Sequence, residues 1–194
     1  MKKIFIFLTL VSFIYNSYAQ AYNLSMGINF SYQDRSIEIG YKQKPLMGFN
    51  AQFSRDFRLW KALNISSELG FFQAGVRYNQ PRYMEFLSYS QFGLFLMYKS
   101  VRSPFYVGIG GVGDLLLSAS AFDGETTIKL NKAIFDFYDY AIEPIWGMSL
   151  DFDFIAYFLE MRFHYGLNNI SIDNREKIKN FGFKISLGVS LKIH

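Results

Sequence analysis

Regular alternation of polar and apolar residues is the feature that most limits what this chain can fold into. In residues 22–32, the even positions from 24 to 30 are Leu, Met, Ile and Phe, and the odd positions from 23 to 31 are Asn, Ser, Gly, Asn and Ser. Successive side chains of a β-strand point to opposite faces, whereas a helix repeats every 3.6 residues. This segment is therefore expected to be a strand with one polar and one apolar face.

Further segments of this kind make eight expected strands, most of them about 10 to 14 residues long, a length with which tilted strands cross a bilayer. The other seven are residues 47–54, 62–74, 89–98, 104–118, 139–152, 156–167 and 180–193. Two apolar residues blur the polar face of 89–98, and the glycine-rich segment 104–118 leaves its register open.

The connections between these segments alternate in length. The short ones are residues 55–61, 99–103 and 153–155, and the long ones are residues 33–45, 75–88, 119–138 and 168–179. Short turns on the periplasmic side and long loops outside are typical of outer-membrane barrels. The sequence therefore predicts an all-β fold, an eight-stranded antiparallel up-and-down transmembrane β-barrel with short periplasmic turns and long extracellular loops.

A soluble, lipocalin-like binding barrel alternates in the same way but turns its apolar face inward. Three features favour the membrane barrel. The polar face is mostly Gly, Ser and Asn, whereas a water-exposed surface would carry more charge. The large apolar residues would overfill an eight-stranded interior. Aromatic residues gather near strand ends, as interfacial girdles do; they are Tyr22, Tyr32, Phe57, Trp60, Tyr98, Tyr140, Phe152, Tyr157 and Tyr165.

The N-terminus reads as a secretory signal peptide over residues 1–19. Lys2 and Lys3 precede an apolar run over residues 4–14 that is too short to span a membrane, and Ser17 and Ala19 form a cleavage site. The mature barrel domain would be residues 20–194. We expect an integral protein of a Gram-negative outer membrane with both termini periplasmic, and with membrane lipids and the barrel-insertion machinery as partners.

Composition narrows the function classes. Hydrophobic residues make up 51% of the chain and charged residues 19%, which excludes a disordered chain. There is no cysteine, and so no disulfide or thiol nucleophile. The net charge is +4, and loss of Lys2 and Lys3 with the signal peptide halves it, which argues against a nucleic-acid partner.

Several segments carry a resemblance to a known family; they are Gly27–Phe30, Leu63–Leu69, Phe105–Gly110, Leu115–Ser118 and Tyr157–Leu167. Together with the signal peptide followed by Gln20, they resemble the outer-membrane β-barrel domain of Bacteroidota, the PorT-like group, over essentially the whole mature chain. The resemblance implies an outer-membrane barrel and no particular activity. Chains of that family usually end in an aromatic residue that the insertion machinery reads, whereas this chain ends in His194.

Charged residues on the polar faces are expected to point into the lumen. They are Glu68, Asp114, Glu143, Asp151, Glu160, Arg162, His164 and Lys184. Lone charges in a narrow lumen are unfavourable and must pair. We predict a structural polar cluster that plugs the lumen, made of Glu68, Glu143, Glu160, Arg162, His164 and Lys184. The alternative is a polar track for a small solute or ion.

We predict no catalytic, cofactor or metal site. His164 could serve a lipid-modifying outer-membrane hydrolase if Ser186 faced it across a strand pair, but no nucleophile-elbow sequence is present. His164 and His194 are too few and too far apart in sequence to suggest a metal site. Residues 108–113 match a dinucleotide fingerprint, but a strand continues where the motif needs a helix.

The predicted function is therefore that of a porin-like outer-membrane barrel with a structural or surface-interaction role and no enzymatic activity. The four long connections would form the outward surface and could bind a protein or other surface partner. The longest, residues 119–138, could cap the barrel, extend a hairpin above the membrane or meet that partner. The main alternative is a PorT-like accessory of transport or protein secretion.

Overall fold

The computed structural model describes residues 21–35, 43–78, 83–100, 102–130, 135–172 and 177–192. The predicted signal peptide and the last two residues lie outside this range. In the described part of the chain, no helix is long and apolar enough to span a membrane. The described strands are β1 (Ala21–Arg35), β2 (Gln43–Trp60), β3 (Leu63–Tyr78), β4 (Tyr83–Lys99), β5 (Phe105–Phe122), β6 (Thr127–Lys129), β7 (Tyr138–Asp151), β8 (Ile155–Gly166) and β9 (Ile178–Lys192).

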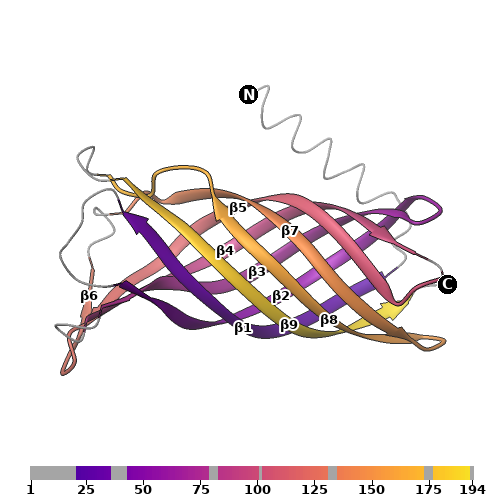
Figure 1. The fold of residues 1–194 in the computed structure, drawn as a ribbon, viewed down its shortest axis with the longest axis horizontal. Coiled ribbons are helices and arrows are strands. Elements are labelled where there is room, and N and C mark those ends of the chain that lie inside the picture. The colour runs from indigo at the N-terminus through magenta and orange to yellow at the C-terminus, as the bar shows by residue number, and fades with distance from the viewer. Residues whose placement is uncertain are drawn as a thin grey trace.

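Eight of these strands form a closed barrel (Figure 1). Each pairs antiparallel with its neighbour in the order β1, β2, β3, β4, β5, β7, β8 and β9. β9 pairs back onto β1 along the whole of β1, from Ala21 opposite Lys192 to Arg35 opposite Ile178. The predicted eight-stranded antiparallel barrel is thus confirmed.

The apolar face of the strands points outward. Leu24 is 58% exposed and Leu187 is 65% exposed, whereas Asn29, Gln33 and Glu143 are buried. This is the reverse of a soluble barrel with an apolar interior. Most of the aromatic residues expected near the strand ends are exposed as well, but Phe57 is buried beneath the guanidinium of Arg55.

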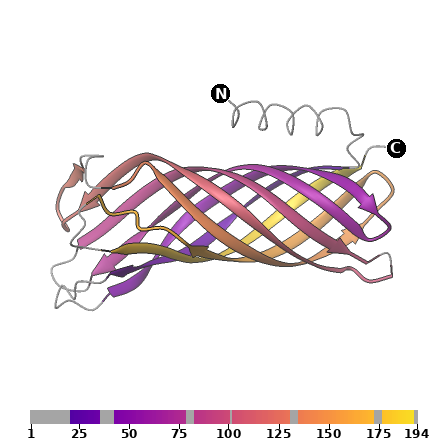
Figure 2. The same ribbon diagram turned by 90° about the horizontal axis from the view of Figure 1, so that it is seen from above.

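The strands are longer than the alternation predicted, mainly at the end that carries the long connections (Figures 1 and 2). β2 begins at Gln43, β3 runs to Tyr78, β4 begins at Tyr83 and β5 runs to Phe122, so residues expected in loops continue the sheet. These extensions carry outward polar residues such as Lys44 and Arg77. The alternation of polar and apolar residues is lost there, so it did not predict the extensions. The backbone ladder continues there because main-chain pairing does not depend on an apolar outer face.

The connection over residues 119–138 both extends a hairpin and caps the barrel. β6 pairs with the last residues of β5, where Ser120 is opposite Lys129 and Phe122 is opposite Thr127. Phe135 then returns to the barrel mouth, where it forms a β-bridge with Ser171 and is buried. Two of the three roles considered for this segment are therefore combined in one structure.

Two apolar clusters occupy the lumen on either side of its polar middle. The cluster at the loop end contains Phe72, Ala74, Leu87, Tyr89, Leu116, Ala119, Phe135, Ile170 and Ile178. The second contains Phe95, Met97, Tyr106, Val112, Ala141 and Ile145. Phe95 and Met97 are the apolar residues that blur the alternation of residues 89–98. Glycine makes room for Phe95, because a Cβ on Gly110 would overlap its ring.

We predict that Gly27→Ala weakens the seam between β1 and β9. A Cβ at Gly27 would overlap the main-chain carbonyl of Ile185, which cannot move without breaking the ladder. The expected loss is about 1–3 kcal/mol or more in the free energy of unfolding, measured by urea titration in detergent.

Gly111→Ala is the matched control, since a Cβ there meets no atom within 4 Å in the described structure. Equal unfolding midpoints for the two variants would contradict the role assigned to the Gly27 contact.

Candidate functional site

The lumen network centres on Arg162 of β8. Its Nη1 and Nη2 donate hydrogen bonds to the two carboxylate oxygens of Glu68, at 2.8 Å and 2.6 Å, and its Nε donates to Glu160 at 2.5 Å. β3 and β8 are opposite one another in the closed strand order, so the pair of Glu68 and Arg162 bridges the lumen. Two parallel bonds to one carboxylate are the strongest arrangement available to a guanidinium.

Lys184 of β9 forms a second bridge across the lumen. Its ammonium donates to Glu143 on β7 at 2.6 Å and to Gln91 on β4 at 3.0 Å. It also lies 4.3 Å from the centre of the Phe72 ring, a cation–π contact. Lys184 is directly opposite Arg162 in the pairing of β8 and β9, so the two buried cations are neighbours.

Glu143 connects the two bridges. Its Oε1 lies 2.6 Å from the ammonium of Lys184 and 2.8 Å from Nδ1 of His164. Its Oε2 lies 3.6 Å from Nη1 of Arg162. The structure thus brings the six residues of the expected cluster into one continuous network. These are Glu68, Glu143, Glu160, Arg162, His164 and Lys184, and all six are buried.

The two remaining charged residues expected in the lumen lie in different environments. Asp114 on β5 joins the network, accepting a hydrogen bond from Gln91 at 2.8 Å and lying 3.7 Å from His164. Asp151 does not join it. It lies at the short-turn end of β7 with its side chain 59% exposed and pairs with Lys192 at 3.2 Å. Alternation gave its face correctly, but Asp151 lies at the rim rather than within the lumen.

Several polar partners escaped the sequence analysis. Tyr106 donates to Glu160 at 3.0 Å, and Asn180 donates to Asp139 at 2.9 Å and to Tyr89 at 3.1 Å. Asp139 is the first residue of the expected segment 139–152 and shares the face of Glu143, so alternation placed it inward, but it was not counted among the lumen charges. Tyr106 and Tyr89 gave no such signal, because a tyrosine suits either face.

The pairing of His164 with Ser186, on which the hydrolase alternative rested, is wrong. His164 is opposite Gly182 in the β8–β9 ladder, and Ser186 is opposite Glu160. The hydroxyl of Ser186 donates to Asn50 at 2.7 Å instead. The glycine-rich residues 108–113 are strand throughout, so the dinucleotide motif lacks the helix it needs.

A cavity of about 820 Å³ occupies the lumen at the short-turn end. It runs from the short turns to Glu160 and Arg162 and has Asn23, Asp56 and Lys99 on its wall. Lys99 pairs with Asp56 at 2.6 Å. Beyond Arg162, the network and the loop-end apolar cluster fill the lumen with buried side chains. The two ends of the lumen therefore differ, one hollow and one packed.

The fold is similar to solved outer-membrane barrels. Neisserial surface protein A matches with a TM-score of 0.54 and 16% identity, covering 89% of this chain and 99% of that chain. The outer membrane protein OprG of Pseudomonas aeruginosa matches with a TM-score of 0.50 and 12% identity, covering 92% and 98%. At these identities the likeness concerns the fold. No protein-family model matches the chain, and a search of curated proteins finds no match.

We predict that Arg162→Met destabilises the barrel strongly. The variant keeps an apolar chain of similar length but leaves Glu68 and Glu160 buried without their cation. Removing one partner of a buried pair costs about 3–5 kcal/mol. The midpoint of the heat-induced shift in gel mobility measures the change.

Two further variants test the cause. Adding Glu68→Gln and Glu160→Gln to Arg162→Met should recover part of the loss, because no unpaired charge then remains. Asp151→Asn, at the exposed pair with Lys192, should change stability by less than about 1 kcal/mol. A midpoint for Arg162→Met that matches the Asp151→Asn control would refute this reading.

Proposed function

We propose that the protein is an integral outer-membrane barrel whose lumen is sealed by the polar network, and that it acts through contacts made outside the lumen. The observation that carries the proposal is the combination of an apolar outer face with charges buried across the middle of the barrel. This is a structural or surface-interaction role. We assign the protein no catalytic activity.

The outer face supports membrane embedding. Its exposed large residues come from all eight barrel strands and include Ile28, Phe49, Leu69, Leu94, Ile109, Trp146, Met161 and Leu187. A continuous apolar surface of this kind is unfavourable in water and matches the hydrocarbon core of a bilayer. The signal peptide predicted over residues 1–19 supports export, and we propose that the short turns and both ends of the chain face the periplasm.

The sealed lumen supports action at the surface. Eight strands leave an interior that side chains just fill. Here Arg162 and Lys184 each reach carboxylates or amides on other strands. Phe72 of the loop-end cluster packs against Lys184, and Phe95 of the second cluster packs against Arg162. The extended strands, together with the hairpin of β5 and β6, then present the outward surface where a partner would bind.

A second candidate is the accessory role in transport or secretion that the PorT-like resemblance implies. The cavity at the short-turn end favours it, because it is lined by charged groups such as Asp56, Lys99 and Arg162. In this role a periplasmic partner or small solute would occupy the cavity. The membership of the PorT-like family is part of this proposal.

Cell fractionation and conductance separate the candidates. Expression of the full chain in a Gram-negative host should give an outer-membrane band whose gel mobility changes on boiling. Planar bilayers containing the purified barrel should show no steady conductance if the lumen is sealed. Recovery in the soluble periplasm would overturn the membrane proposal, and steady conductance would overturn the sealed lumen and favour transport.

We predict that Ile28→Arg reduces stability in lipid. Ile28 lies midway along the outward face of β1, where an arginine would enter the hydrocarbon core. The expected cost is about 2–4 kcal/mol, measured by urea titration in lipid vesicles.

The same substitution at Ile128 is the control, because Ile128 is exposed on β6 at the loop end of the barrel. It should be nearly neutral. Equal effects of the two substitutions would show that the face around Ile28 is not in lipid.

A further inference from the structure

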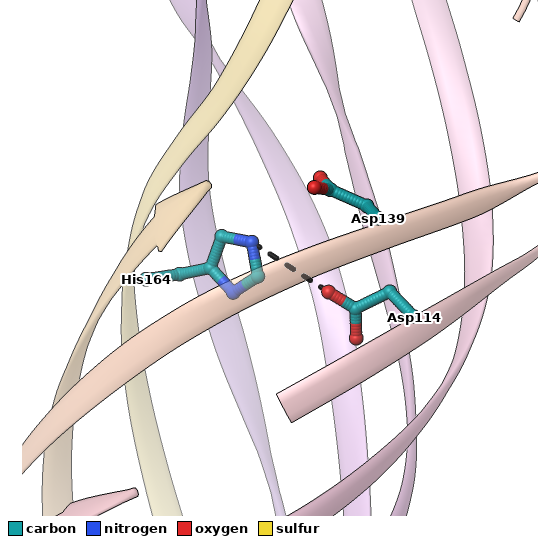
Figure 3. Close-up of side chains that lie close together, drawn as sticks. All are labelled: Asp114, Asp139 and His164. Carbon is teal, nitrogen blue, oxygen red and sulfur yellow. Dashed lines mark ion pairs between the residues drawn. The ribbon is translucent and has the colours of Figure 1, made fainter. Parts of the chain in front are cut away.

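Three buried side chains converge on one point in the loop-end half of the lumen. Asp114, Asp139 and His164 come from the neighbouring strands β5, β7 and β8, and one potential ligand atom of each lies within 4.8 Å of the others (Figure 3). All three residues are at least 98% buried. Figure 3 shows the imidazole and the Asp114 carboxylate turned toward each other, with the Asp139 carboxylate above them.

Each of the three side chains has one polar atom that is left without a hydrogen bond. Oδ2 of Asp114, Oδ1 of Asp139 and Nε2 of His164 have no hydrogen-bond partner among the residues that the structure describes. The separation of 3.7 Å between Nε2 of His164 and Oδ2 of Asp114 is too long for a hydrogen bond. Buried polar atoms are normally paired, so an unpaired atom on each of three converging side chains indicates a missing partner.

The other polar atom of each side chain is held in place. Gln91 donates to Oδ1 of Asp114 at 2.8 Å, and Asn180 donates to Oδ2 of Asp139 at 2.9 Å. Nδ1 of His164 lies 2.8 Å from the Glu143 carboxylate. A histidine that ligates a metal almost always has its second ring nitrogen on a carboxylate, a carbonyl or a water, and ligating carboxylates are oriented in the same way.

The charges favour a cation at this point. Asp114 and Asp139 are directly opposite in the β5–β7 ladder, where like charges repel. Within the described network, five carboxylates face two permanent cations, Arg162 and Lys184. These carboxylates are Glu68, Asp114, Asp139, Glu143 and Glu160. The excess is three negative charges, and one divalent cation would remove two of them.

We propose that Asp114, Asp139 and His164 bind a divalent first-row transition-metal ion, of which Zn²⁺ is the simplest probe. One imidazole and two carboxylates suit such a metal, whereas Ca²⁺ and Mg²⁺ prefer oxygen ligands alone. Metal–ligand bonds of about 2.0–2.1 Å place tetrahedral ligand atoms about 3.4 Å apart, close to the 3.7 Å between His164 and Asp114. The remaining coordination position would be open to water.

Metal content is the first test. The full chain, carrying an affinity tag without histidine, is purified in detergent, stripped with a chelator, incubated with Zn²⁺ and dialysed against metal-free buffer. We expect about one Zn²⁺ per chain by elemental analysis. We expect at least a tenfold loss of affinity in Asp139→Asn and His164→Gln, each of which removes one ligand while keeping a similar shape.

Asp56→Asn is the matched control, because Asp56 is a buried carboxylate paired with Lys99 near the short turns and outside the proposed site. It should bind Zn²⁺ as the unaltered chain does. Zn²⁺ should raise the midpoint of the heat-induced mobility shift in the unaltered chain and in Asp56→Asn, and leave it unchanged in Asp139→Asn and His164→Gln.

The competing explanation is a protonated His164 that balances the carboxylates without any metal. In that case the unaltered chain retains no Zn²⁺ and its midpoint does not respond to the ion. That result, or equal retention by the unaltered chain and both ligand variants, would overturn the proposal. Because the unaltered chain alone can give the first of these results, the test does not depend on the variants folding.

Discussion

The pairing of Arg162 with Glu68 is the interaction on which the rest of the lumen depends. It joins strands on opposite sides of the barrel, and both side chains are buried, so the loss of either one leaves the other without its main counter-ion. Glu160 and Glu143 lie beside the same guanidinium, and the Glu143 carboxylate also contacts Lys184 and His164. A substitution at Arg162 therefore removes a partner from three carboxylates at once, those of Glu68, Glu143 and Glu160. The polar groups in the middle of the lumen are coupled in this way.

The network and the apolar clusters have different roles in specifying the barrel. Apolar side chains such as Phe95 and Leu116 fill space and tolerate small shifts. A guanidinium that donates two hydrogen bonds to one carboxylate instead fixes the position of one strand relative to another along the barrel axis. A slip of one residue would turn every side chain of a strand to the other face. In this barrel such a slip would also expose Lys184 or Arg162 to lipid.

Alternation predicted the strands, the closed barrel and the inward placement of the cluster residues, because a period of two follows directly from strand geometry. It could not predict which inward groups would touch, since contact across the lumen depends on strand tilt and stagger. Asp151 shows this limit, because it has the expected face but lies at the rim. Asp139 shows another, because it lies on the inward face at the first position of the expected strand 139–152, where alternation alone does not show whether a side chain reaches the lumen or the rim. The blurred face around Phe95 and Met97, by contrast, was a true signal of an apolar patch in the lumen.

The seam between β1 and β9 has a consequence for how the chain acquires its fold. Each residue of β1 pairs with a residue of β9 from Ala21 opposite Lys192 onward, which joins segments separated by most of the chain. The loop that this pairing closes is the longest in the molecule, so its entropic cost is met only when the other strands are already in register. Chains dominated by such distant contacts fold slowly. We therefore expect closure to be the last step of assembly, with the edges of β1 and β9 open to pairing with another protein until it occurs.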